Sequence, residues 1–170
     1  FTVLPGAATE LHLNVSPATV EGDGSMTMTG ELLPTQPQVE LRDFDGNLVT
    51  TTNTGVATIR IKSGAGGNLS TGQTTANFVG GVATFTGVKL IGIPWVDYQI
   101  EFVSTNPDLS VDASDIIRVA HNVADHIALT RAAAGGKAGV RFSTQPVVKV
   151  LDRFDNVVTD GPGSQDLVTV

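Results

Sequence analysis

The sequence predicts an all-β fold in which antiparallel β-sandwich repeats follow one another in tandem. Three observations support this prediction. First, only 16% of the 170 residues are charged and 5% are aromatic, whereas Val, Thr, Ile and Gly are abundant. Val, Thr and Ile suit a pleated, half-buried backbone, and Gly marks turns and bulges. Second, short segments of alternating polarity are separated by turn residues, and no segment has a helical period with caps. Third, parts of the sequence recur.

The internal repeat predicts the domain organisation. Residues 35–50 read TQPQVELRDFDGNLVT and residues 144–159 read TQPVVKVLDRFDNVVT, which makes eight of sixteen positions identical at an offset of 109. Upstream, ATELHL at 8–13 matches ADHIAL at 124–129 at an offset of 116. Self-similarity of this kind indicates an array of similar units. We expect three parts: the closing strand of a preceding repeat plus a linker (1–7), a complete repeat (8–123) and the N-terminal part of the next repeat (124–170).

Within the complete repeat, alternation predicts the strands in order. They are 9–15, 38–42, 48–51, 57–62, 74–79, 82–86, 98–104 and 115–121. The turn DFDGN at 43–47 follows the second strand. Gly80-Gly81 predicts a hairpin between 74–79 and 82–86, since two glycines readily adopt the positive φ of a tight turn. The run GAGGNLSTGQ at 64–73 is interpreted as a flexible loop.

The same alternation predicts the core. Tyr98, Ile100 and Phe102 share one face of their strand, and Gln99 and Glu101 lie on the other. Because the chain has one Trp and one Tyr, we expect a mostly aliphatic core. The residues expected to be buried are Val39, Leu41, Ile59, Ile61, Val82, Phe85, Tyr98, Ile100 and Phe102.

Several segments resemble the bacterial immunoglobulin-like repeats of invasin- and adhesin-type surface proteins. PQVELRDFDGNLV, then GGVATFTGVKL and VDYQIEFVS, match that family's proline-led strand, its Asp-x-x-Gly-Asn turn, its Gly-Val-Ala-x-Phe strand and its late Tyr strand. The resemblance covers residue 8 to about 121, then 124 to the end, although Asp155 replaces the turn glycine in the second copy. It implies an immunoglobulin-like sandwich.

The resemblance also implies a class of function. Such modules serve as stalks, adhesins or extracellular fibres at the cell surface or outside the cell. Their expected partners are neighbouring repeats, other subunits of a fibre, or glycans and proteins of the cell surface or matrix. The alternative is a carbohydrate-binding or spacer module attached to a secreted enzyme. Flanking sequence would separate the two.

Charge and composition exclude several other classes. A net charge of −7 argues against binding to nucleic acid or to anionic membranes. No segment approaches the roughly 18 consecutive apolar residues of a spanning helix, so we expect no membrane insertion. The absence of cysteine excludes disulfides and thiolate metal sites. The N-terminus lacks the basic start and apolar core of a signal peptide and is interpreted as mid-protein sequence.

Residues 124–170 match only the opening of the repeat. Forty-seven residues without cysteine bury too little apolar surface to be stable alone. We therefore expect the missing strands to come either from further residues of a continuous array or from other subunits.

No catalytic residues, metal or cofactor are predicted. Nucleophile-elbow, Walker and His-Glu-x-x-His motifs do not occur. Asp43, Asp45 and Asn47 resemble the opening of a calcium loop, but Leu48 stands where that loop requires Gly, and Thr54 occupies its twelfth position. We favour a turn stabilised by Asp and Asn side chains. The histidines at 12, 121 and 126 have no partners at catalytic or zinc-binding spacing and are interpreted as surface or linker residues.

Three residues are kept as candidate ligand or modification sites. Trp95 is a candidate sugar contact because a flat aromatic face can stack on a pyranose ring, and whether it lies in the core or on the surface stays open. Asn14 and Asn68 begin Asn-x-Ser sequons. Asn68 is the favoured acceptor, because Pro17 follows the first sequon.

Overall fold

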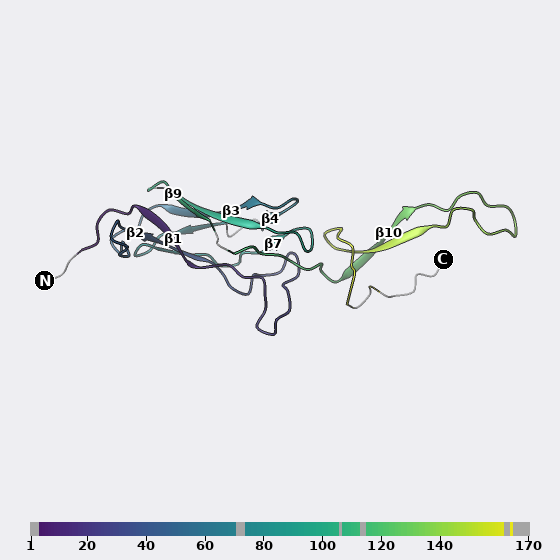
Figure 1. Ribbon diagram of the computed structural model, residues 1–170, viewed down its shortest axis with the longest axis horizontal. Coiled ribbons are helices and arrows are strands. Elements are labelled where there is room, and N and C mark those ends of the chain that lie inside the picture. The colour runs from purple at the N-terminus through teal and green to yellow at the C-terminus, as the bar shows by residue number, and fades with distance from the viewer. Residues whose placement is uncertain (1–3, 71–73, 106, 113–114, 162–163, 165–170) are drawn as a thin grey trace. The chain divides into compact units, whose positions relative to one another are not determined.

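The computed structural model describes the chain except residues 1–3, 71–73, 106, 113–114, 162–163 and 165–170 (Figure 1). The chain divides into two compact units, Phe1–Ala120 (unit 1) and His121–Val170 (unit 2). Unit 1 contains β1 (Glu10–Val15), β2 (Gln38–Arg42), β3 (Val56–Ser63), β4 (Asn68–Leu69), β5 (Thr75–Asn77), β6 (Val82–Thr84), β7 (Leu90–Ile91), β8 (Gln99–Thr105) and β9 (Leu109–Asp112). Unit 2 contains β10 (Ala124–Arg131) and β11 (Val147–Asp152). The predicted all-β class is confirmed.

Unit 1 is a sandwich-like pair of antiparallel sheets. One sheet has the strand order β1-β2-β6, the other has the order β5-β3-β8-β9, and β4 pairs with β7 in a small third sheet (Figure 1). The strands expected at 38–42 and 98–104 are confirmed as β2 and β8. No helix of the described residues is long and apolar enough to span a membrane.

The core lies between the two sheets. Alternate residues of each strand point inward, as the two-residue period of a strand requires. The rings of Phe85 and Phe102 meet at 5.6 Å between centroids. Of the residues expected to be buried, all but Ile61 and Val82 are buried. Those two are half-buried: Ala83 and Phe85 take the inward positions beside Val82, and the β3–β8 register shifts after Ile61.

The sequence predicted a hairpin at Gly80-Gly81, but only its turn is found. The turn forms as expected, with φ values of 58° and 79° and mutual hydrogen bonds between Val79 and Val82. The flanking strands do not pair with each other, however. β5 pairs with β3 in one sheet, and β6 pairs with β2 in the other. The turn therefore passes the chain from one sheet to the other.

The prediction of a flexible loop at 64–73 is also corrected, because two glycines of its described part pack against the buried Tyr98 ring. Gly64 and Gly67 lie so close to the Tyr98 ring that a Cβ on either would come within 2.2 Å and 2.4 Å of a ring carbon, respectively. Gly92 approaches the same ring, where a Cβ would lie 2.6 Å from the phenol oxygen. Asn68 begins β4 directly after this approach. We call Gly64, Gly67 and Gly92 the glycine cradle.

Other expected elements differ at their ends. The short strands β4, β7 and β9 were not predicted from the sequence. The strand expected at 115–121 is reduced to isolated bridges, Tyr98 with Ile117 and Met28 with Ala120. The one expected at 48–51 is a single bridge between Arg42 and Leu48. The closing strand expected within residues 1–7 was placed at Phe1–Val3, and these three residues lie outside the described residues.

Unit 2 shows the same strand pairing as the first two strands of unit 1. In unit 1, Leu11 pairs with Leu41 and Leu13 with Val39. In unit 2, the residues at offsets of 116 and 109 make the equivalent pairs, Ile127 with Val150 and Leu129 with Val148. The two units differ in how far this face is buried: Leu11 is 2% exposed, whereas its counterpart Ile127 is 56% exposed. Within the described part of unit 2, β10 and β11 form the only sheet, so this apolar face has no second layer.

Candidate functional site

Trp95 occupies an unusual position in a tight turn. The amide of Val96 donates to the carbonyl of Ile93 at 3.4 Å, which places Pro94 second and Trp95 third in the turn. Trp95 has φ of 66°. A turn with Pro second and a positive φ third corresponds to type II, where the third residue is ordinarily Gly or Asn. Trp95 is 54% exposed, so this residue is on the surface and not in the core.

The turn is held to the sandwich at two further points. The Trp95 amide donates to the Val119 carbonyl at 3.0 Å. The Tyr98 hydroxyl accepts from the Ile93 amide at 2.7 Å, and its own proton can go to the Ala65 carbonyl at 3.0 Å. Desolvation by burial raises the pKa of Tyr98, so this hydroxyl stays protonated at neutral pH. The backbone around Trp95 is therefore rigidly positioned.

An ion pair lies beside this turn. Arg118 donates through Nε to the Asp97 carboxylate, and each side chain is 50% exposed. The hydrogen bond from Arg118 holds the pKa of Asp97 below its usual value and raises that of Arg118. Both groups are thus charged at neutral pH and remain accessible to solvent.

A second feature is the buried carboxylate of Asp43, which is 5% exposed. Its Oδ1 accepts from the amides of Asp45 at 3.0 Å and Asn47 at 2.9 Å. Its Oδ2 accepts from the amide of Gly6 at 2.9 Å, so the carboxylate joins its own turn to the segment that precedes β1. We call this arrangement the Asp43 clasp.

Unit 2 contains the same arrangement around Asp152, the residue at an offset of 109. Oδ1 accepts from the amides of Phe154 at 2.8 Å and Asn156 at 2.9 Å. Oδ2 accepts from the amide of Asn122 at 2.8 Å. The turn position held by Gly46 in unit 1, with φ of 81°, is held here by Asp155 with φ of 64°. The replacement keeps the geometry, because Asp tolerates the left-handed region better than most residues.

These contacts bear on the calcium hypothesis. The Asp43 oxygens already accept hydrogen bonds from several N–H groups, and these bonds must break before the carboxylate could ligate a cation. Within the described ranges, no group of three or more acidic or histidine side chains could hold a metal ion. The turn interpretation accounts for each contact of Asp43, and the absence of metal stays a prediction.

We expect the clasp to make unit 1 sensitive to acid. The hydrogen bond from the Gly6 amide, followed by that from Asn47, holds the pKa of Asp43 below its usual value. A lowered pKa in the folded state stabilises the fold above the ordinary Asp pKa of about 3.9, and this contribution is lost as the pH falls through the lowered value. Asp43→Asn should lower Tm at pH 7 by roughly 5 °C or more, because an amide NH₂ would face N–H donors.

Asp45→Asn is the matched control, since Asp45 is exposed and the substitution removes the same charge. Calorimetry between pH 7 and pH 2 should show the Tm difference between wild type and Asp43→Asn shrinking toward pH 2. A difference that stays constant with pH, or an equal loss in Asp45→Asn, would contradict the clasp.

The histidines are partly reassigned. His121 is 8% exposed, and its Nε2 lies 2.7 Å from Asp160 while Nδ1 lies 2.9 Å from the Asn122 carbonyl. It is therefore buried in unit 2 and not a surface residue. His12 and His126 lie on β1 and β10, beside Glu10 and Asp125 respectively. The three do not combine into a metal-binding group among the described residues.

The two sequon asparagines are both exposed on strands. Asn68 begins β4, so it does not lie in a flexible loop as expected. Asn14 lies on β1, and its Nδ2 donates to the Gln38 Oε1 at 2.6 Å. That nitrogen is the atom a glycan would modify. Asn68 therefore remains the more accessible of the two candidates.

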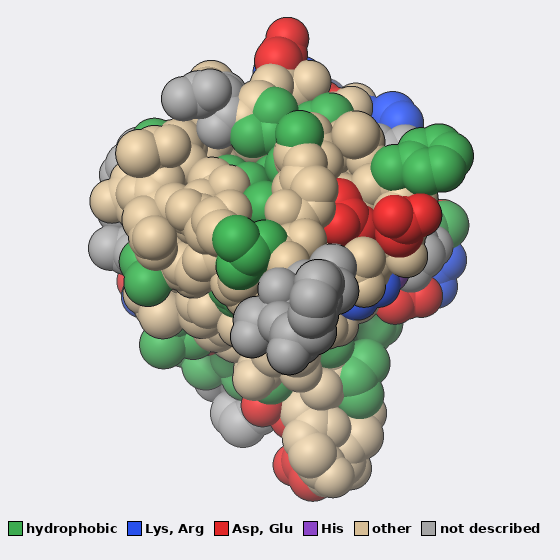
Figure 2. All heavy atoms as spheres, turned by 90° about the vertical axis from the view of Figure 1, so that its left-hand side faces the viewer, with side chains coloured by type: hydrophobic (Ala, Val, Ile, Leu, Met, Phe, Trp, Pro, Cys, Tyr) green, Lys and Arg blue, Asp and Glu red, His purple; other side chains and the backbone are tan. Residues whose placement is uncertain are grey.

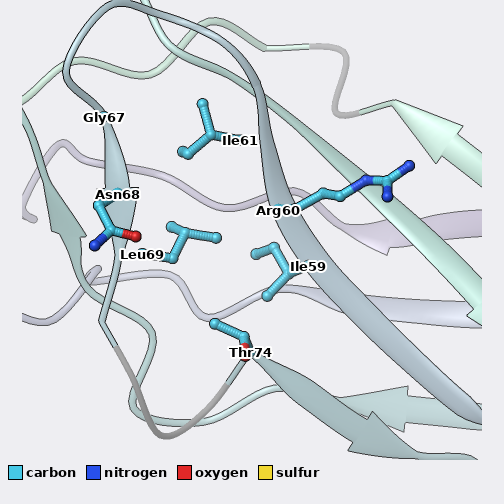
Figure 3. A pocket seen from close by; sticks show the side chains of 7 residues that line it. All are labelled: Ile59, Arg60, Ile61, Gly67, Asn68, Leu69 and Thr74. Atoms are coloured by element: carbon cyan, nitrogen blue, oxygen red, sulfur yellow. The ribbon is translucent and has the colours of Figure 1, made fainter.

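A pocket of about 240 Å³ lies between β3 and β4 (Figure 3). Its lining residues are Ile59, Arg60, Ile61, Gly67, Asn68, Leu69 and Thr74. The Arg60 side chain extends away from the others and pairs with Glu101 at 2.7 Å (Figure 3). No second ionisable group is among these lining residues, so the pocket lacks an acid–base pair.

The surface at the β2 end of unit 1 has no basic patch on the face shown in Figure 2. Acidic and hydrophobic side chains are interspersed there with polar ones, and the few basic side chains lie apart. This agrees with the net charge of −7. Comparison of the chain with protein-family models, with curated proteins and with solved structures gave no match.

Proposed function

We propose that this chain is a structural or adhesive module of a secreted or cell-surface protein, built of immunoglobulin-like repeats in tandem. Residues 8–123 form one repeat and 124–170 the first part of the next. The observation that carries the proposal is the recurrence of one buried arrangement. Asp43 and Asp152 bind equivalent amides, at distances that agree within about 0.2 Å.

The arrangement of unit 1 supports the immunoglobulin-like assignment. Its main sheets have three and four antiparallel strands and face each other across one core. Tyr98 immediately precedes β8, and its hydroxyl bonds to the backbone of Ile93, five residues upstream. This contact resembles the tyrosine corner of immunoglobulin-like sandwiches.

The clasp also supports a load-bearing role. Each buried Asp binds the backbone of the segment before its unit's first strand, Gly6 in unit 1 and Asn122 in unit 2. At the end of unit 1, the N–H and C=O of Ala120 bond to Thr27 and Thr29. Hydrogen-bonded linker residues have few free dihedral angles, so an array of such units would bend little. Limited bending suits a stalk or fibre, which holds its parts apart.

We test the proposal with four joined copies of residues 8–123, preceded by residues 4–7 so that the first copy keeps the Gly6 partner of Asp43. Unit 1 has a closed core of its own, and joining Val123 to Ala8 reproduces the natural Val123–Ala124 junction, because Ala8 corresponds to Ala124. Stretched by atomic force microscopy, the protein should give four equal unfolding events. Each should release about 400 Å of chain, at roughly 3.5 Å per residue.

Small-angle scattering on two, three and four copies separates a rod from a flexible chain. The maximum dimension should grow in proportion to copy number, and Asp43→Asn in every copy should make that growth sublinear. Sublinear growth in the unmodified protein would reject the rod, and fewer unfolding events than copies would reject the repeat boundaries.

A further inference from the structure

We infer that Trp95 and the adjacent Asp97–Arg118 pair form a carbohydrate-binding site, with the indole stacking on the face of a pyranose ring. The inference goes beyond the proposed array, because it rests on one turn of unit 1 and does not require a second repeat.

The backbone of Trp95 provides the first observation. A bulky residue with φ of 66° is a genuine outlier, since its side chain crowds the backbone in the left-handed region. Gly would occupy this turn position without strain. Folding alone therefore favours Gly here, and a strained bulky residue on the surface suggests a function for its side chain.

The second observation is that the indole is exposed and yet firmly mounted. Trp95 is 54% exposed, whereas its backbone is fixed by the turn bond from Val96 and by the bond from the Trp95 amide to Val119. The Tyr98 hydroxyl fixes Ile93 at the start of the turn. Because the backbone of this turn is already ordered, binding of a ligand to the indole would cost little backbone conformational entropy. The turn is thus preorganised to present a flat apolar face.

The neighbouring polar groups indicate the class of ligand. Asp97 lies two residues after Trp95, and Arg118 immediately precedes Val119, whose carbonyl holds the Trp95 amide. The half-exposed ion pair offers both acceptors and donors on residues next to the turn that carries the indole. A pyranose ring has the matching combination, an apolar C–H face and an edge of hydroxyl groups. A nucleic acid would place phosphates against a chain of net charge −7.

The chain has one Trp, so its fluorescence reports on Trp95 alone. The full chain is titrated with hexasaccharides of neutral, amino and acidic pyranoses, for example cellohexaose, chitohexaose and polygalacturonic hexamer, and with choline chloride as a cation probe. At least one hexasaccharide should shift the emission saturably, and choline should not.

Variants separate binding from a structural role. Trp95→Gly should leave Tm at or above the wild-type value, since it relieves the positive φ, and should reduce affinity at least tenfold by calorimetric titration. Trp95→Phe should retain part of the affinity. Phe44→Ala, which removes an aromatic side chain that is 90% exposed in another turn, should leave affinity unchanged.

Three results would overturn the site. They are a response to choline but to no sugar, no response to any member of the panel, and a fall in Tm of Trp95→Gly without loss of sugar binding. The last would show that Trp95 packs against protein. None of these outcomes alters the Asp43 clasp, so the array proposal is tested separately.

Discussion

Replacement of Phe102 by alanine is expected to cost about 3–5 kcal/mol of the free energy of unfolding, a large part of the stability of a domain this size. Phe102 is fully buried, and its ring contacts Phe85 across the two sheets. Truncation leaves a cavity that strands from two sheets cannot easily close. Urea unfolding followed by fluorescence gives the midpoint and the slope, and the midpoint should fall with little change in slope.

Val103→Ala is the matched control, because Val103 is the next residue of β8 and faces the other side of the sheet. Val103 is half-buried, and we expect its truncation to cost at most about 1 kcal/mol. Equal losses in the two variants would show that the side chains of β8 are not divided between core and surface as described.

Gly67→Ala is expected to destabilise unit 1 by about 3 kcal/mol, although it adds a single methyl group. That carbon would lie 2.4 Å from a ring carbon of Tyr98, and the ring is held through its hydroxyl by the backbone of Ile93 and Ala65. Relief therefore requires a backbone shift. The control is Gly22→Ala, since a Cβ on Gly22 meets no atom within 4 Å. Thermal unfolding should show a fall in Tm only for Gly67→Ala.

A double-mutant cycle checks the cause. In a Tyr98→Leu background, Gly67→Ala should cost much less, because the ring that it contacts has gone. Additive losses would mean that Gly67 is required for its backbone conformation and not for the approach of Tyr98.

Local sequence patterns predicted the strands that alternate clearly and lie near the middle of a sheet. The segments at 38–42 and 98–104 each pair with a strand on both edges. One face of each packs on the core and the other does not, which gives the sequence a clean two-residue period. The short strands β4, β7 and β9 have two to four residues, too few to show any period. Their existence depends on partners distant in the chain.

The candidate site was only partly accessible to sequence analysis. Trp95 was identified as the best aromatic candidate, but its exposure depends on a turn whose positive φ is unusual for Trp. The Pro94 before it was the available signal, since Pro is common at the second position of a type II turn. The roles of Asp97 and Arg118 were missed, because they lie 21 residues apart and meet only when Tyr98, just before β8, bridges to Ile117.

The sequence by itself determined what depends on neighbouring residues: the all-β class, the alternation within strands, the Asp43 turn and its recurrence at Asp152. Only the tertiary structure decided which strands pair and what each turn packs against. Gly80-Gly81 illustrates the division, since two glycines determine a tight turn but not whether its strands stay in one sheet. The glycine cradle illustrates it again. Glycine permits both a mobile loop and the close approach of a ring, and the choice depends on whether a distant side chain, here Tyr98, occupies the space that a Cβ would fill.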